Sequence, residues 1–136
     1  MQNMTIVDMV GRTMISVTPA EQGSEEISFV SSDGLRFLFY HSQDCCEGVA
    51  VEDVCGDLCD LIGSPITLAE EATSEDGKTI DPFTGAVCAV DYEDSQTWTF
   101  YKFSTIKGSV TVRWLGQSNG YYSERVDLAV TKIPAP

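Results

Sequence analysis

Apolar and polar residues alternate along most of this chain, which is typical of β-strands with one buried face. The alternation predicts four strands in the first half of the chain, over residues 12–18, 27–32, 35–41 and 49–54. Asp33-Gly34 separates the second strand from the third, and this pair supplies the positive φ that a two-residue turn needs. We therefore expect residues 27–41 to form a β-hairpin.

The middle of the chain has a different pattern. Leu58, Leu61 and Ile62 fall on one helical face and Gly63 is a typical C-terminal cap, so the sequence predicts a short helix here, with Asp57 as its N-cap. Residues 65–73 are extended again, and the acidic stretch 74–94 is expected to form a long loop or flap.

The last third predicts three consecutive antiparallel strands, a β-meander. Its expected strands cover residues 98–106, 110–115 and 121–130, with turns at Lys107-Gly108 and Asn119-Gly120. Trp98, Phe100 and Trp114 are expected in the core. The predicted fold class is α+β: a mainly antiparallel twisted sheet with a C-terminal β-meander and one or two short helices, in a single domain over residues 1–136.

Charge narrows the function. The chain has 136 residues and a net charge of −13, and residues 21–94 alone carry −16 against +3 for residues 95–136. Such a surface repels nucleic acid and anionic lipid, so neither is an expected partner. A basic protein surface, a cation or a small molecule remains, as does a purely solubilising role. No basic leader or long apolar run is present, so we expect a cytoplasmic location.

The densest chemical cluster lies between His41 and Asp60, with the only histidine and four of the five cysteines. An odd cysteine count with Cys45 and Cys46 adjacent favours reduced thiols. The spacing fits neither a zinc knuckle nor an EF-hand, so no cofactor is assigned and a divalent metal stays an alternative. Otherwise Cys45, Cys55 and Cys59 are small core residues.

His41 has two interpretations. As a general base it would be oriented by Asp44 or Asp57 and would activate Cys45 or Cys46, but the acidic surroundings disfavour a thiolate. The favoured interpretation is structural: His41 ends a strand and its ring bonds a neighbouring carboxylate or backbone carbonyl. Arg113 is expected to pair with the acidic segment. No catalytic residue is assigned and an enzyme is disfavoured. The candidate ligand- or partner-binding residues are His41, Asp44, Glu47, Asp53, Asp57 and Asp60, with Ser118, Asn119, Tyr121 and Tyr122 on a turn typical of binding loops.

Four strings of residues resemble a family of small uncharacterised domains found mainly in bacteriophages and prophages, over about residues 28–128. They are His41-Ser-Gln-Asp-Cys-Cys-Glu47, Gly56-Asp-Leu-Cys-Asp-Leu-Ile-Gly63, Trp98-Thr-Phe-Tyr-Lys102 and Arg113-Trp-Leu-Gly-Gln-Ser-Asn-Gly-Tyr-Tyr-Ser-Glu124. The resemblance implies a phage origin, hence the cytoplasm of an infected bacterium, and no activity.

Three functional hypotheses follow. The first is an acidic accessory or counter-defence protein that binds a basic host protein surface in the manner of a mimic of nucleic acid charge. The second is a small-ligand sponge, for a nucleotide for example, that uses residues 118–123. The third is a metal-binding domain or metal-dependent enzyme around His41, Asp44, Asp57 and Asp60.

Overall fold

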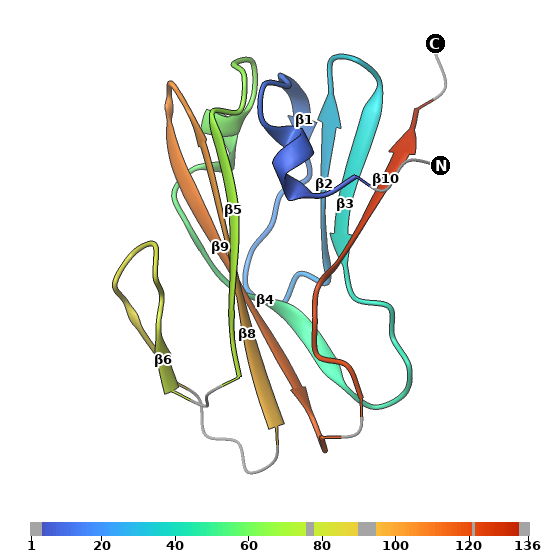
Figure 1. The fold of residues 1–136 in the computed structure, drawn as a ribbon, viewed down its shortest axis with the longest axis vertical. Coiled ribbons are helices and arrows are strands. Elements are labelled where there is room, and N and C mark those ends of the chain that lie inside the picture. The colour runs from blue at the N-terminus through green and yellow to red at the C-terminus, as the bar shows by residue number, and fades with distance from the viewer. Residues whose placement is uncertain (1–3, 76–77, 90–94, 121, 134–136) are drawn as a thin grey trace.

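Two four-stranded antiparallel sheets pack face to face in the computed structural model, which describes residues 4–75, 78–89, 95–120 and 122–133 (Figure 1). The first sheet has the strand order β1 (Met14–Val17), β2 (Glu26–Ser31), β3 (Leu35–Tyr40), β10 (Asp127–Lys132). The second has the order β4 (Gly48–Cys55), β9 (Gly108–Ser118), β8 (Ser95–Thr105), β5 (Leu68–Ser74). The predicted hairpin over residues 27–41 is confirmed as β2 and β3.

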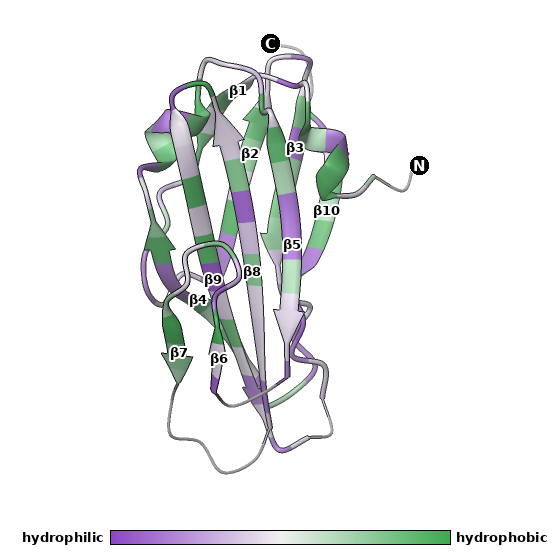
Figure 2. Ribbon diagram, turned by 60° about the vertical axis from the view of Figure 1, so that its left-hand side comes forward, coloured by the Kyte–Doolittle hydropathy of each residue, from purple (hydrophilic) through white to green (hydrophobic). Residues whose placement is uncertain are grey.

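The main core lies between the two sheets, because alternate side chains of each strand point inward. Phe29 and Phe39 of the first sheet meet Tyr101 and Phe103 of the second. The ring centroids of Phe39 and Tyr101 are 4.9 Å apart, and those of Phe29 and Phe103 are 5.1 Å apart. Green apolar bands along the facing strands mark this core in Figure 2.

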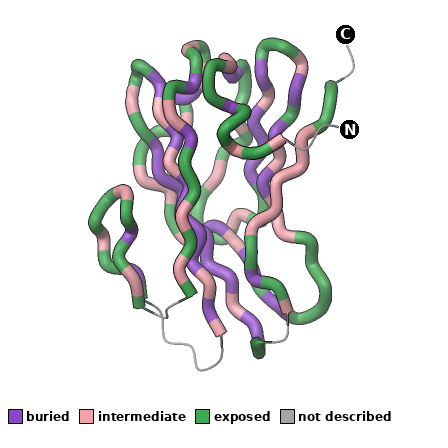
Figure 3. Tube along the Cα trace, viewed as in Figure 1, coloured by how far each residue is buried: buried purple, intermediate pink, exposed green. Residues whose placement is uncertain are grey.

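A second apolar layer covers the outer face of β8 and β9. Trp98, Phe100 and Leu115 are buried there beneath Phe83 and Cys88, which belong to a flap built on β6 (Lys78–Ile80) and β7 (Val87–Ala89). The buried state predicted for Trp98 and Phe100 is confirmed, but they lie under the flap rather than between the sheets. Both faces of β8 and β9 are therefore covered, and most residues of these two strands are buried (purple in Figure 3).

Arg113 of β9 fastens the flap to the sheet. Its Nε donates to the buried carboxylate of Asp81 over 2.6 Å, and its other guanidinium nitrogens donate to Asp53 over 2.7 Å and to Thr84 over 2.8 Å. Burial opposes ionisation of Asp81, but the hydrogen bonds from Arg113 and from the backbone of Phe83 lower its pKa below the ordinary value. The predicted pairing of Arg113 with the acidic segment is confirmed.

The predicted C-terminal meander is wrong. β8 and β9 form a hairpin, but β10 crosses to the other sheet and pairs with β3. The reason is that β9 is an inner strand: β8 and β4 already occupy its two edges, so a third consecutive strand has no place beside it. Beside β3, β10 packs Leu128 and Val130 against the main core.

The predicted mainly antiparallel β-sheet is confirmed, but the α part of the predicted class is not: the described helical elements are two short 3-10 turns, η1 (Ile6–Met9) and η2 (Leu58–Leu61), so the fold is mainly β. η2 lies where a helix was predicted, and the predicted Asp57 cap is confirmed by its bond from the Cys59 N–H at 2.9 Å. Gly56 and Gly63 flank it with φ of 114° and 86°, which limits the helix to one turn.

Candidate functional site

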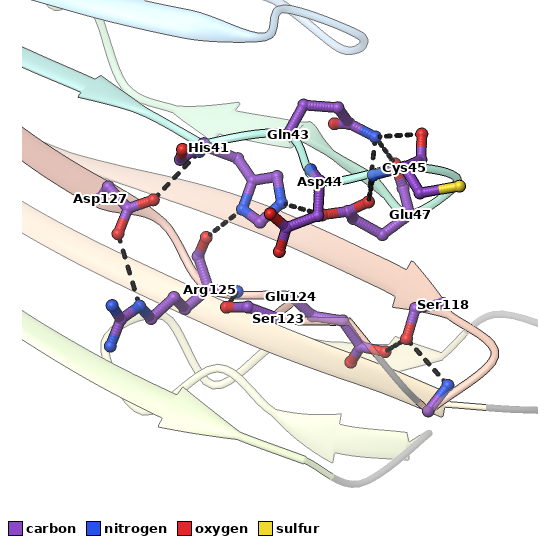
Figure 4. A network of polar contacts seen from close by, with 12 residues as sticks. His41, Gln43, Asp44, Cys45, Glu47, Ser118, Ser123, Glu124, Arg125 and Asp127 are labelled. Atoms are coloured by element: carbon purple, nitrogen blue, oxygen red, sulfur yellow. Dashed lines mark hydrogen bonds and ion pairs between the residues drawn. The ribbon is translucent and has the colours of Figure 1, made fainter.

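Two chain segments far apart in sequence meet at one end of the sandwich. Residues 41–47 follow β3, and the second segment comprises Ser118 at the end of β9 and residues 119–120 and 122–125 after it (Figure 4). Apart from Arg125, both segments fall within the strings of residues that carry the family resemblance. The centre of the meeting point is His41, which contacts a residue from each segment.

His41 is held by both ring nitrogens. Nε2 lies 2.8 Å from Oε2 of Glu47, and Nδ1 lies 2.7 Å from the backbone carbonyl oxygen of Arg125. Both partners are acceptors, so only the protonated imidazolium donates to both at once. Burial lowers the pKa of His41, but the hydrogen bonds to Glu47 and to Arg125 together raise it above 6.5. The predicted structural role of His41 is confirmed, with a carboxylate and a carbonyl both engaged.

Glu47 is the anchor of the loop that precedes β4. Its side chain has no solvent exposure, and it accepts the backbone N–H groups of Cys45 at 2.9 Å and Asp44 at 3.0 Å in addition to His41. The hydrogen bond from His41 outweighs burial and, with those backbone donors, lowers the pKa of Glu47 to about 2. Residues 42–47 therefore wrap around a permanent negative charge.

Glu124 is the matching anchor of the second segment. Its carboxylate accepts the hydroxyl groups of Thr97, at 2.8 Å, and of Ser118. The Glu124 backbone lies so close to β9 that a Cβ on Gly116 would clash with its carbonyl oxygen. Only glycine fits at position 116, and the segment is thereby pressed against β9 before it crosses to β10.

This arrangement leaves His41 without a free nitrogen for acid–base chemistry. Its ring is oriented by Glu47, not by Asp44 or Asp57 as the catalytic interpretation required. Cys45 and Cys46 are exposed and joined as a disulfide, so the expected reduced thiols and the buried position of Cys45 are both wrong here. Cys59 is also exposed, whereas Cys55 is half-buried. The structure places His41 and Glu47 together as a structural pair.

The other acidic candidates lie elsewhere. Asp60 lies in η2 and Asp57 is its N-cap, after the end of β4, whereas His41 and Asp44 precede the start of β4. Asp53 lies on β4 and pairs with Arg113. No cluster of three or more histidine, cysteine, aspartate or glutamate side chains suited to a metal ion occurs in the described ranges.

The candidate binding residues at the end of β9 and in the following loop differ in solvent exposure. Ser118 is buried and its hydroxyl serves Glu124, while Asn119 is exposed and Tyr122 is half-buried. Tyr121 lies outside the described residues. A cavity of about 330 Å³ brings Ser123 together with His41, Ser42 and Asp44, so the two segments do share a surface.

A larger groove runs along β4, and sequence reasoning missed it. It has a volume of about 510 Å³, and its lining includes Glu25, Gln43, Glu52, Gln117 and residues 48–51, together with the paired His41 and Glu47. No lysine or arginine is among its described lining residues. We call this the β4 groove. The sequence indicates this groove only through the acidic excess of residues 21–94. Its residues come together through the tertiary fold, as the 3.2 Å hydrogen bond from Gln22 to Glu52 illustrates.

Comparison with known proteins gives a family but no activity. No helix in the described ranges has the length and apolarity needed to cross a membrane. No curated protein and no solved structure matches the chain significantly. A family model, described as a domain of unknown function, DUF7448, matches residues 7–128. Because that match covers most of the chain, the protein belongs to the DUF7448 family of domains of unknown function.

Proposed function

We propose that this domain is an acidic binding protein that recognises a basic surface of another protein through the β4 groove. Its resemblance to phage and prophage domains supports a role as a phage accessory or counter-defence protein with a host partner. In such a role the groove presents carboxylates where a host protein normally meets the phosphates of nucleic acid.

The observation that carries the proposal is the uncompensated charge of the surface. Twelve carboxylates between residues 21 and 75 reach solvent, and of these only Asp33 and Asp53 are in ion pairs within the described chain. By contrast, the buried acids of the described chain, Glu47, Asp81 and Glu124, each accept hydrogen bonds from neighbouring side chains. Uncompensated surface charge steers an oppositely charged partner and raises the association rate.

Part of this charge lies where a partner has room to bind. Glu25 and Glu52 line the β4 groove, and Glu21 belongs to the turn whose Gly23 bonds to β4. The remaining exposed acids are spread over β2, β4, β5, η2 and the loops, where their effect is solubility. The β4 groove is therefore the part of the surface best suited to a basic partner.

A small-molecule sponge is the second candidate, because the groove has the volume typical of ligand sites. Its lining opposes a nucleotide, since Glu25 and Glu52 would repel phosphates and no described lysine or arginine offsets them. A small ligand of this groove would be cationic.

The test is a capture experiment with matched charge variants. Three proteins are immobilised and exposed to bacterial lysate: the wild type, the groove variant Glu25→Gln/Glu52→Gln and the control variant Glu70→Gln/Glu75→Gln. Each variant loses two negative charges, but only the first alters the groove. Captured proteins are purified and their affinities measured between about 50 and 500 mM salt. We expect the groove variant alone to bind at least about tenfold more weakly, and affinity to fall with salt. Equal binding by the two variants, or affinity insensitive to salt, would contradict the proposal.

A further inference from the structure

β4 is an edge strand of its sheet, and its outer edge forms one wall of the β4 groove. Edge strands present backbone donors and acceptors that can pair with another chain. A backbone group of this edge that has no hydrogen-bond partner within the chain is available to a strand of another molecule.

The chain itself already pairs with this edge at one point. The N–H of Val51 donates to the carbonyl of Ser24 over 2.8 Å, and the carbonyl of Val51 accepts from the N–H of Gly23 over 2.7 Å. Val51 therefore directs its backbone groups away from β9. These two bonds show that the outer edge of β4 accepts main-chain partners from outside its sheet.

Val49 has the same orientation without the partner. Backbone direction alternates along an antiparallel strand, so Val49, two residues before Val51 and on the same side of the β-bulge, also directs its N–H and carbonyl away from β9. Among the described residues, no hydrogen bond occupies either group. Gly48, Val49 and Ala50 line the groove at this place.

The surroundings of this unpaired backbone select its occupant by charge. Glu25 and Glu52 line the same groove, and neither is in an ion pair with a described residue. A second copy of this edge would bring like charges together, which opposes self-pairing. A segment with lysine or arginine side chains would neutralise them instead.

We infer that an extended basic segment of the partner adds to β4 beside Gly48–Ala50. One of its residues exchanges two main-chain hydrogen bonds with Val49, and its lysine or arginine side chains reach Glu25 and Glu52. This mode, β-strand addition, rests on the proposed function and adds the backbone geometry of recognition to it.

The test uses the full chain and synthetic peptides with capped ends. The parent peptide is Lys-Val-Lys-Val-Lys, the charge control replaces lysine with glutamate, and two further peptides carry N-methyl groups on all lysines or on both valines. In an added strand only alternate residues direct their N–H toward β4. We expect one methylated peptide to bind at least about tenfold more weakly than the parent and the other to bind within about twofold. Amide exchange of Val49 should slow at least about tenfold when the parent binds.

The outcomes separate the two proposals. If both methylated peptides match the parent while the glutamate peptide does not bind, recognition is by charge alone: strand addition is overturned and the proposed function stands. If the parent binds no better than the glutamate peptide at low salt, both proposals fail. Slow exchange of the Val49 amide in the free protein would also overturn strand addition, because the edge would already be occupied.

Discussion

Nε2 of His41 lies 2.8 Å from Oε2 of Glu47, and both side chains are closed off from solvent. The same imidazole reaches the carbonyl of Arg125, so one side chain joins the loop before β4 to the crossover before β10. These two segments border the β4 groove and the adjoining cavity. The histidine therefore helps to shape the candidate surface.

Breaking this pair is expected to destabilise the fold. Glu47→Gln removes the charge that holds His41 and should lower the melting temperature by about 5–10 °C, since a buried ion left without its partner is costly. Asp44→Asn, an exposed neighbour in the same loop, is the control and should change it by less than about 2 °C. Thermal unfolding followed by circular dichroism measures both, and equal melting temperatures for the two variants would show that the pair is not structural.

The pair also predicts a pH window of greatest stability. The pKa of His41 is raised above 6.5, so its contribution is complete below that pH and is lost as pH rises through the folded-state value. The pKa of Glu47 falls from 4.5 to about 2, so its contribution is complete above 4.5 and is lost as pH falls toward 2. Stability from the pair should peak between pH 4.5 and 6.5. Urea unfolding across pH 3–9 checks this, and His41→Gln should abolish the alkaline decline; a decline that persists in the variant comes from other groups.

The contact between Gly116 and Glu124 gives a sharp steric prediction. Gly116→Ala places a methyl group against the Glu124 backbone and should cost about 1–3 kcal/mol in free energy of unfolding. Gly48→Ala is the matched control, because a Cβ there meets nothing within 4 Å. Chemical denaturation distinguishes them. If both alanine variants are equally stable, the crossover is not pressed against β9 as described.

Arg113 should control the attachment of the flap. Arg113→Lys keeps the charge but loses the three-way contact with Asp53, Asp81 and Thr84, at a cost of about 3 kcal/mol because Asp81 is buried. The flap between residues 78 and 89 should then be cleaved faster by proteases. Limited proteolysis with mass spectrometry locates the cuts. Cleavage unchanged from wild type would mean that apolar packing on Trp98 and Phe100 alone holds the flap.

The strands were predictable from sequence because local alternation and turn residues determine them. The Asp33-Gly34 hairpin and the Asp57 cap depend on neighbours within a few residues. The structural role of His41 follows from the need of a buried imidazole for hydrogen-bond partners. The crossover of β10 was not predictable in this way. It follows from which strands take the two edges of β9, and no short stretch of sequence contains that information.

The candidate site was predictable only in part. The acidic segment indicated the sign of the charge, but the β4 groove combines residues near positions 22–25, 43, 48–52 and 117, which the fold brings together. By contrast, the dense run of cysteines and acids between His41 and Asp60 predicted a single cluster. In the fold β4 lies between residues 41–47 and residues 57–60, so they form no single site.

The proposal that the β4 groove binds a basic partner is tested most directly by locating the binding site of a basic peptide. Titration of isotope-labelled protein with the Lys-Val-Lys-Val-Lys peptide, followed by amide chemical shifts, locates the contact surface residue by residue. We expect the largest shifts on residues 22–25, 48–53 and 117, and we expect them to disappear in Glu25→Gln/Glu52→Gln. Shifts of equal size along β5 at Glu70–Glu75, or none at the groove, would contradict it.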